Sequence, residues 1–379
     1  MRIAVPSEAD PEPRVAATPE TVKKMVALGA EVAVQAGAGI KSGILDSDFE
    51  AAGAAIRGTV EQTVADADVV LKVRRPAAEE TAHYRRGALV VAIMDPYGNE
   101  AALRQLAEAG LTAVAMELMP RITRAQAMDV LSSQANLAGY RAVIEGAAEF
   151  GRALPLMMTA AGTIPATRVF VMGAGVAGLQ AIATARRLGA VVTATDVRPA
   201  AKEQVESLGA KFIAVEDEEF KQAETAGGYA KEMSKDYQAK QAALVADHLK
   251  KQDIVITTAL IPGRPAPRLL SRAMVASMRP GSVVVDLAIE RGGNVEGARA
   301  DQVVDSGGVK IVAYSNLPGR IAASASALYA KNLYNFLDIL VDKKTKTLAV
   351  NWDDEIVKAT LLTRDGAVVH PNFVPKTAA

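Results

Sequence analysis

At 379 residues the chain is long enough for two domains, each able to bury an apolar core without covalent cross-links. Its 43 basic and 43 acidic residues balance, which argues against long-range attraction to nucleic acid or to an anionic membrane surface. Cysteine is absent, so disulfides, thiolate metal sites and cysteine nucleophiles are excluded, and redox chemistry would need a cofactor. The longest apolar runs fall far short of the ~20 residues that a bilayer crossing requires, so we expect no membrane-spanning segment in this polypeptide.

The N-terminal third alternates short β-branched runs with amphipathic segments. This pattern predicts a helix over 18–26, in which Thr18 is the N-cap, Pro19 the first helical residue and Gly29 the stop signal. Strands are predicted at 3–5, 31–35, 69–73 and 89–94. We therefore expect the first ~130 residues to form an α/β domain around a largely parallel sheet.

A second α/β series follows a helix predicted over 130–150 from apolar residues three and four apart. Its strands are predicted at 168–172, 191–195, 253–258, 283–287 and 310–313. A last helix over 322–340 is expected to return to the first domain, and Asp365-Gly366 predicts a hairpin turn. The predicted fold has two doubly wound, mostly parallel α/β domains with a nucleotide cleft between them. The first domain comprises residues 1–132 plus 318–379, and the second, a Rossmann domain, comprises residues 133–317.

A glycine motif, Gly173-Ala174-Gly175-Val176-Ala177-Gly178, follows the strand at 168–172 and opens a helix predicted over 176–188. The first glycine permits a tight turn, the second lets the backbone approach a pyrophosphate, and the third allows close helix packing. The helix N-terminus supplies N–H donors and a favourable dipole. We therefore expect a dinucleotide at Gly173, Gly175, Val176, Ala177 and Gly178.

An acidic residue, Asp196, follows the strand at 191–195 and lies 18 residues beyond Gly178. A carboxylate there accepts hydrogen bonds from the adenosine ribose hydroxyls and repels a 2′-phosphate, which predicts NAD rather than NADP. Arg198 counts against this prediction, because an arginine near this position can hold a 2′-phosphate. We include Val197 with Asp196 and Arg198 among the expected cofactor contacts.

Many polar residues lie in segment 121–134, between the apolar run at 111–119 and the helix at 130–150. From spacing alone, this segment is a solvated loop in which Asp129 or Ser132 is an N-cap. Its residues nevertheless carry a resemblance. The strings Met116–Asp129, Leu131–Gln134, Asn136–Val143, Met157–Thr163 and Thr257–Gly263, with the glycine motif, are similar to proton-translocating transhydrogenases over most of the chain.

The resemblance implies an NAD(H)-binding component that passes a hydride from NADH to NADP⁺ held by a separate NADP(H)-binding component. A third, membrane-spanning proton-channel component would couple this Re/Si-specific transfer to proton translocation. The resemblance also implies a homodimer that is cytoplasmic and peripheral, held at the cytoplasmic face of the inner membrane through its partner.

In that family the polar segment meets the NADP(H)-binding component. Carried over, Arg121, Asp129 and Ser132 hold the nicotinamide of NAD(H), and Gln126 reaches toward the partner's nicotinamide. These four are the expected catalytic residues, because hydride transfer between two nicotinamides needs only rings held in contact with water excluded. Further cofactor contacts are expected at Ile122, Thr123, Arg124 and Ser133.

Residues 216–251 are strongly charged and are interrupted by a Gly-Gly-Tyr sequence. They form either a solvent-exposed insertion or a segment that folds over bound nucleotide. The resemblance implies a mobile loop here, with Gly228, Tyr229 and Gln241 contacting or covering NAD(H), and Leu260 is a further expected contact. The loop after Asp286 either borders the site or simply ends a strand.

Two other functions remain open. An alanine dehydrogenase shares the segment Arg14–Pro19 and a carboxylate-binding lysine like Lys72, but it needs a histidine in the segment that reads Ala92–Pro96 here. The three histidines are His83, His248 and His370. A catalytically silent NAD-sensing module is the third hypothesis, and the presence of Gln126 and Asp129 argues against it.

Overall fold

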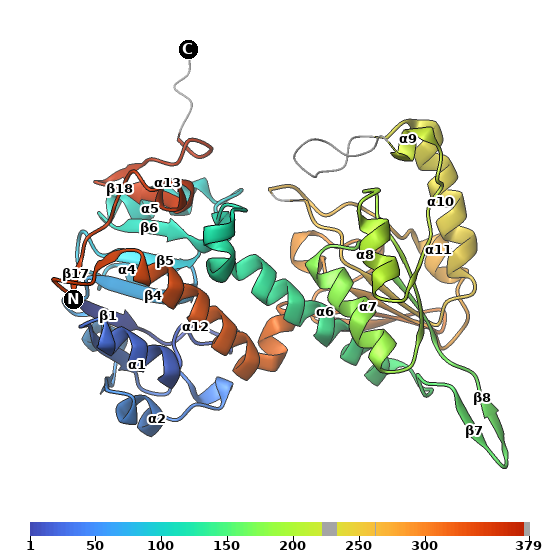
Figure 1. The fold of residues 1–379 in the computed structure, drawn as a ribbon, viewed down its shortest axis with the longest axis horizontal. Helices are drawn as coiled ribbons and strands as arrows, with labels where there is room; N and C mark the ends of the chain where they lie inside the picture. Colours follow the sequence, from blue (N-terminus) through green and yellow to red (C-terminus); the bar gives the residue numbers. More distant parts are fainter. Residues whose placement is uncertain (222–232, 262, 375–379) are drawn as a thin grey trace. The chain divides into compact units, whose positions relative to one another are not determined.

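The computed structural model describes residues 1–221, 233–261 and 263–374 (Figure 1). Two compact units make up the chain: Met1–Gln134 with Gly319–Ala379, and Ala135–Pro318. Each unit is built on its own mostly parallel sheet, so the predicted α/β class is confirmed. None of the helices in the described ranges has the run of apolar residues that a bilayer crossing requires.

The first unit contains an eight-stranded sheet in the order β19-β18-β6-β5-β4-β1-β2-β3. Its parallel strands are β1 (Arg2–Val5), β2 (Glu31–Gln35), β3 (Ala54–Arg57), β4 (Val69–Arg74), β5 (Leu89–Ile93) and β6 (Thr112–Ala115). The antiparallel β18 (Leu361–Arg364) and β19 (Ala367–Val368) form the predicted hairpin around Asp365-Gly366. A separate small hairpin pairs β16 (Val341–Asp342) with β17 (Thr347–Leu348).

Helices in this unit are α1 (Pro19–Ala27), α2 (Asp46–Ala51), α3 (Val60–Val64), α4 (Ala78–Thr81), α5 (Glu100–Glu108), α12 (Ala322–Asp338) and α13 (Glu355–Thr360). The unit also contains 3₁₀ helices η1 (Ile40–Ser42), η2 (Met116–Leu118) and η3 (Thr123–Met128). Thr18 caps α1 as predicted, because its side chain accepts a hydrogen bond from the N–H of Thr21.

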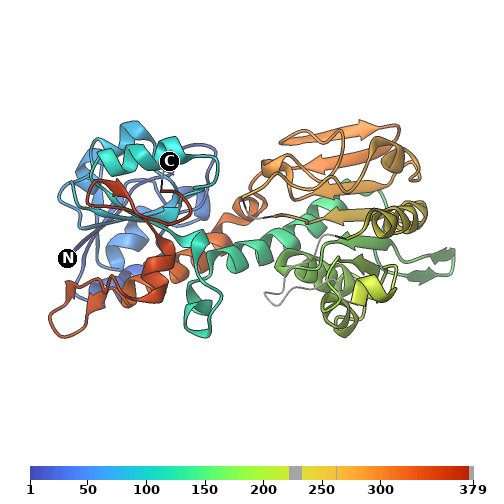
Figure 2. The same cartoon turned by 90° about the horizontal axis from the view of Figure 1, so that it is seen from above.

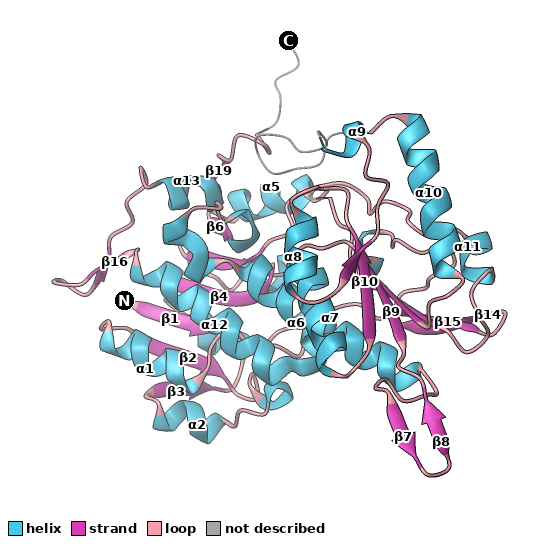
Figure 3. Ribbon diagram, turned by 45° about the vertical axis from the view of Figure 1, so that its right-hand side comes forward, coloured by secondary structure: helices cyan, strands magenta, loops and turns pink. Residues whose placement is uncertain are grey.

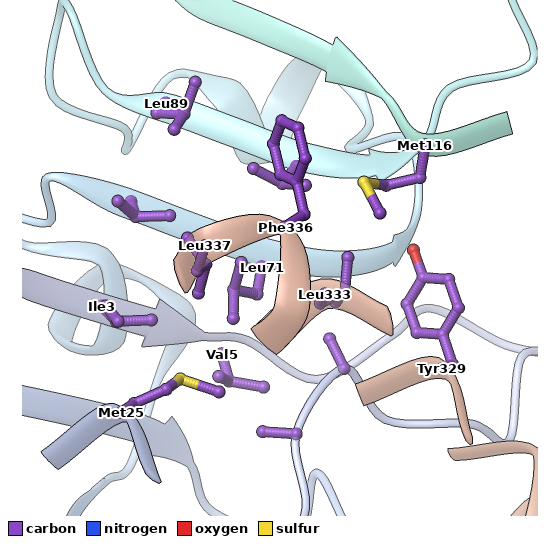
Figure 4. Packing of buried hydrophobic residues seen from close by; sticks show 14 of the residues in the cluster. Ile3, Val5, Met25, Leu71, Leu89, Met116, Tyr329, Leu333, Phe336 and Leu337 are labelled. Carbon is purple, nitrogen blue, oxygen red and sulfur yellow. The ribbon is translucent and has the colours of Figure 1, made fainter. Parts of the chain in front are cut away.

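The late helix α12 completes the core of the first unit (Figure 4). Tyr329, Leu333 and Phe336 recur at a spacing of three to four residues and are fully buried in the same apolar cluster as Leu71 and Met25. A second apolar cluster, which includes Leu103 of α5, packs the other residues of the strands. The alternation of strand residues between two clusters is typical of a sheet covered on both faces.

The second unit contains a seven-stranded sheet in the order β11-β10-β9-β12-β13-β15-β14. Figure 2 shows the ribbon of this unit from above. Its strands are β9 (Arg168–Met172), β10 (Val191–Thr195), β11 (Lys211–Phe212), β12 (Ile254–Thr257), β13 (Val283–Asp286), β14 (Gln302–Ser306) and β15 (Val309–Ala313). Only β14, which the sequence pattern did not predict, is antiparallel. The strand order reverses between β9 and β12, and the crevice at such a reversal is where sheets of this kind bind ligands.

Helix α6 (Val130–Glu149) leads from the first unit into the second and matches the predicted helix closely. The other elements are α7 (Val176–Arg187), α8 (Ala201–Ser207), α9 (Glu218–Lys221), α10 (Lys235–Leu249), α11 (Arg272–Ala276), η4 (Ile289–Arg291) and η5 (Leu317–Ile321). The buried strand residues again divide between two apolar clusters, which is typical of a doubly wound fold.

A short hairpin, β7 (Met157–Thr159) and β8 (Gly162–Ile164), projects from the second unit (Figure 3). All six residues of its strands are exposed. Leu156, Met157, Met158 and Ile164 are among the exposed large apolar side chains of the protein, and Met158 is 78% exposed. The hairpin therefore has no core of its own in the described chain.

Candidate functional site

The glycine turn after β9 requires glycine at two positions for different reasons. Gly173 has φ +105°, and a Cβ there would lie 2.5 Å from Thr258 Oγ1. At Gly178, a Cβ would lie 1.8 Å from the carbonyl oxygen of Gly173. The two glycines therefore let the chain reverse sharply and let α7 pack directly against the turn.

Gly175 differs, because the space beside it is open. It precedes α7 with φ −77°, and, apart from its chain neighbours, no described residue has a heavy atom within 4 Å of the position a Cβ would take. The first N–H groups of α7 have no acceptor within the helix, and the helix dipole favours an anion at this end. Gly175 and the exposed Val176 thus border open space suited to a phosphate group.

Ala177, another expected cofactor contact, packs against α6. A Cβ at Gly139 of α6 would lie 2.0 Å from the carbonyl oxygen of Ala177. No sequence motif singled out Gly139. An unusually small residue on the helix preceding the glycine motif was the only available signal for it.

The carboxylate of Asp196 is fixed beside the glycine turn. Its Oδ2 accepts a hydrogen bond of 2.7 Å from the N–H of Ala174, and its Oδ1 accepts one of 2.9 Å from the N–H of Arg198. The guanidinium of Arg198 also donates to both carboxylate oxygens, at 3.0 and 3.1 Å. Val197 lies between them and is exposed. The arginine that counted against NAD thus forms an ion pair with the acid that favours it.

The segment after β12 forms the opposite side of the strand reversal. Thr258 donates its Oγ1 hydrogen bond to the carbonyl of Gly173 at 3.0 Å, which joins the segment to the glycine turn. Two residues later Leu260 is 53% exposed. Val176, Val197 and Leu260 are all exposed. The segments that follow β9, β10 and β12 therefore each carry an exposed apolar side chain.

Asp286, at the end of β13, organises its own loop. It is fully buried, and its carboxylate accepts hydrogen bonds from the N–H groups of Ala288 at 2.9 Å and Val295 at 3.0 Å. Burial raises the pKa of Asp286 despite these donors. Of the two interpretations of this loop, the contacts of Asp286 favour a strand-end structural role.

Two residues of the expected lid, Gly228 and Tyr229, lie outside the described residues. Gln241 on α10 is described, and both ends of its amide are engaged. Its Nε2 donates to Thr195 Oγ1 at 3.1 Å, and its Oε1 accepts from the N–H of Val215 at 2.9 Å. Gln241 therefore ties α10 to the end of β10, beside Asp196.

In the first unit, Asp129 caps α6. Its Oδ1 accepts a 2.9 Å hydrogen bond from the N–H of Ser132, and its Oδ2 accepts one of 2.5 Å from the Ser132 hydroxyl. Ser133 donates to Asn332 Oδ1 of α12 at 2.7 Å. Asp129 and Ser132, predicted from the resemblance to act together, are thus in direct contact.

The 3₁₀ helix before Asp129 carries the remaining expected residues of the polar segment. Arg124 forms a bidentate ion pair with Asp354, with distances of 2.7 and 2.9 Å, which ties η3 to the start of α13. Gln126, Thr123 and Arg121 are exposed, whereas Ile122 is half-buried against the core. Within this segment the structure therefore holds Arg124 by its side chain and presents Gln126 to solvent.

Arg14 and Lys72 belong to buried ion pairs in the first unit. Arg14 Nη2 lies 2.7 Å from Glu12 Oε2, and Lys72 Nζ lies 2.9 Å from Glu80 Oε1 and 3.5 Å from Glu8 Oε2. Burial works against ionisation of Glu12, but the hydrogen bond and charge of Arg14 prevail and hold the pKa of Glu12 at about 2. Burial raises the pKa of Glu8.

All three histidines lie in the described ranges, and none lies in the segment Ala92–Pro96 at the end of β5. His83 faces Glu61 at 3.3 Å, His370 lies 3.2 Å from the carbonyl of Ala359, and His248 lies 2.8 Å from Thr193 Oγ1 in the second unit. The end of β5 carries Asp95, whose N–H donates to Glu117.

Two family models match the chain: alanine dehydrogenase/PNT, N-terminal domain over residues 4–138, and alanine dehydrogenase/PNT, C-terminal domain over residues 142–371. The chain is 58% identical over 377 residues to an NAD(P) transhydrogenase subunit alpha of Rhodospirillum rubrum, with 98% of each chain covered. It is similar to the solved structure of a transhydrogenase from Sinorhizobium meliloti, with a TM-score of 0.89 and 64% identity, over 97% of this chain and 100% of that one. It is also 36% identical over 305 residues to alanine dehydrogenase of Mycobacterium tuberculosis, covering 79% of this chain and 75% of that protein.

Proposed function

The chain belongs to the alanine dehydrogenase/PNT family, and from that membership we propose that it is the NAD(H)-binding component of a proton-translocating transhydrogenase. In this role it transfers a hydride from NADH directly to NADP⁺ on a partner component. The high identity to a protein named as an NAD(P) transhydrogenase subunit alpha supports this choice within the family.

The observation that carries NAD(H) binding is the glycine turn of the second unit. It combines an open position at Gly175, the N-terminus of a twelve-residue helix and a carboxylate fixed beside both. A pyrophosphate fits the first two features, and ribose hydroxyls fit the third. The ion pair with Asp196 supports NAD(H), since it engages the guanidinium of Arg198 that would otherwise be available to a 2′-phosphate.

Hydride transfer between two nicotinamides places modest demands on the protein. The rings must be held in contact, and no group has to take up or release a proton. The exposed Gln126 and the joined pair Asp129 and Ser132 suit this task, with Arg121 as the fourth residue. In this proposal they hold the nicotinamide of NAD(H) and face the partner component.

The word "subunit" in the name of the R. rubrum relative supports a multi-component assembly. We propose an NADP(H)-binding component, a membrane-spanning proton-channel component and a cytoplasmic-face location for this chain. We also propose a homodimer. An isolated two-stranded hairpin is only marginally stable in water, and the apolar side chains of β7 and β8 would be covered by a second copy.

A second candidate function is amino-acid oxidation, as in an alanine dehydrogenase. It is favoured by the 36% identity to the M. tuberculosis enzyme and by the buried cations Arg14 and Lys72. The chemistry requires an acid or base at the reacting amine, and the segment Ala92–Pro96 at the end of β5 contains no histidine. The transhydrogenase proposal needs no such group.

Reconstitution tests the two candidates together. The chain is mixed with an NADP(H)-binding transhydrogenase component, and NADH-dependent reduction of NADP⁺ is followed by rapid mixing. We expect fast transfer that requires both proteins and that is lost in Gln126→Ala. Tight NADH binding without transfer, together with oxidation of alanine, would overturn the proposal in favour of the second candidate.

A further inference from the structure

After β12 the chain makes a long excursion away from the sheet, and it returns beside the loop that follows β13. It leaves the sheet at Thr258, where the N–H of Thr258 extends the β12–β9 ladder, and it returns at Leu270, which forms a bridge with Val295. Its first residues touch the glycine turn, because Ala259 N lies 3.4 Å from the position of a Cβ on Gly173. The exposed Leu260 and Ile261 follow immediately. The excursion therefore begins at the edge of the proposed nucleotide site.

One side chain, Asn294, holds both ends of this excursion. Its Nδ2 donates to the carbonyls of Ala259 at 2.9 Å and Pro267 at 2.8 Å, while its Oδ1 accepts from the N–H of Ala259 at 3.1 Å. Its own carbonyl accepts from the N–H groups of Leu269 and Leu270, at 2.8 and 3.0 Å. The side chain is fully buried, so these partners replace water entirely.

The backbone of Asn294 is in turn held by the side chain of Asp286. The buried carboxylate of Asp286 accepts hydrogen bonds from the N–H groups of Ala288, Asn294 and Val295. The intervening Gly293 has φ +77°, and a Cβ there would lie 2.7 Å from Asp286 Oδ2. A continuous set of contacts thus runs from β13 through Asp286 and Asn294 to Ala259, whose neighbour Leu260 is an expected cofactor contact.

We propose that Asn294 is the positioning residue of the nucleotide site, which sets the backbone of residues 258–260 against the glycine turn and so determines how tightly NADH is held. This inference rests on the proposed function. Both ends of the amide are needed, because Ala259 offers a donor and an acceptor and Pro267 offers only an acceptor.

Asn294→Asp tests the proposal with almost no change in shape. An ionised carboxylate would face the two carbonyls of Ala259 and Pro267, whereas a protonated one could donate to one of them. Asp286, whose carboxylate accepts from the backbone of Asn294, opposes ionisation of the new carboxyl group, and Arg268, whose charge acts on Asp286, favours it. The defect should therefore be large at high pH and partly relieved at low pH. Asn294→Ser replaces the two amide donors by one hydroxyl on a shorter side chain and is neutral, so its defect should not depend on pH.

The measurements are NADH titration between pH 6 and pH 8.5 and amide hydrogen exchange of the same proteins. For Asn294→Asp we expect the Kd for NADH to rise about tenfold or more at pH 8.5, and by a smaller factor at pH 6. Exchange should quicken in peptides covering 258–270 and stay unchanged in β9 and β10. The control is Asn136→Asp, an exposed change on α6 of the same unit that should match the wild type.

Wild-type affinity in both Asn294 variants, or faster exchange throughout the second unit rather than in 258–270, would overturn the proposal. If the wild-type chain fails to bind NADH, the proposed function fails, and the exchange measurement alone decides whether Asn294 holds the excursion. If Asn294→Asp does not fold at pH 8.5, the exchange pattern and affinity of Asn294→Ser decide the question.

Discussion

The guanidinium of Arg198 donates to both carboxylate oxygens of Asp196, with Nε 3.0 Å from Oδ1 and Nη2 3.1 Å from Oδ2. The same Nη2 also lies 3.3 Å from the carbonyl of Ala174 in the glycine turn. Asp196, which was predicted to favour NAD, and Arg198, which was predicted to favour NADP, thus form one ion pair. Removing the acid would leave the arginine available to a phosphate.

Asp196→Asn should therefore shift the preference of the second unit from NADH toward NADPH. The change removes the repulsion of a 2′-phosphate and weakens the hold on Arg198, so we expect the ratio of the two Kd values to change about tenfold or more. Fluorescence titration with each nucleotide measures it. The double variant Asp196→Asn with Arg198→Gln should keep only the part of the gain for NADPH that comes from the lost repulsion. A gain that is undiminished without the arginine would contradict this explanation.

Two glycines of the same motif should respond differently to alanine. Gly178→Ala places a methyl group against the Gly173 carbonyl and should lower the free energy of unfolding by about 1–3 kcal/mol. Gly175 has φ −77° and open space beside it, so Gly175→Ala should change the free energy of unfolding by less than about 1 kcal/mol. It should nevertheless lose NADH affinity. Thermal unfolding and NADH titration of both variants make the comparison. Normal NADH binding by Gly175→Ala would show that the phosphate lies elsewhere.

Asp129→Asn separates helix capping from the proposed role at the nicotinamide. Asparagine is as good an N-cap as aspartate, so the thermal stability should change little. The negative charge is lost, however, and we expect the hydride-transfer rate with the NADP(H)-binding component to fall about tenfold or more, because small errors in ring position are costly. Asp129→Ala, which also loses the cap, is the matched comparison. A wild-type rate in Asp129→Asn would reduce Asp129 to a capping residue.

The buried pair of Glu12 and Arg14 predicts a pH-dependent stability of the first unit. The folded pKa of Glu12 is about 2, below the ordinary value of 4.5, so its contribution is present above pH 4.5 and is lost as the pH falls toward 2. Glu12→Gln should therefore lower the free energy of unfolding by about 3 kcal/mol at pH 7 and by much less near pH 2.

Urea unfolding followed by tryptophan fluorescence measures this loss, because the single tryptophan, Trp352, lies in the first unit. Glu20→Gln is the control: Glu20 forms an exposed pair with Lys24 and should cost little at any pH. An equal loss for Glu12→Gln at pH 7 and near pH 2 would be incompatible with a charge-based contribution.

The exposed hairpin makes the homodimer testable. Met158→Asp adds a charge to its most exposed apolar side chain and should shift the protein toward monomer in analytical ultracentrifugation. Val303→Asp, on an exposed position of β14 in the same unit, should leave the assembly state unchanged. An unaltered dimer in Met158→Asp would move the contact to another surface.

Local patterns in the chain were sufficient for the elements that frame the site. The strand at 168–172 and the strand at 191–195 have the predicted bounds, and helix α7 differs from its prediction by a single residue. The glycine motif could be interpreted because its parts are neighbours in the chain: strand, turn and helix start lie within a few residues of one another. By contrast, no local pattern pointed to Gln126 or Asp129 as nicotinamide contacts, and only a resemblance to known proteins did.

Tertiary structure decided which distant residues hold the site in place. Thr258 reaches the carbonyl of Gly173 across 85 residues of sequence, Asn294 reaches Ala259 across 35, and Arg124 reaches Asp354 across 230. Such pairs depend on strand order and on the register of neighbouring strands, neither of which is recorded in the spacing of apolar residues. The three-residue strands of the exposed hairpin are likewise too short to show a period of their own.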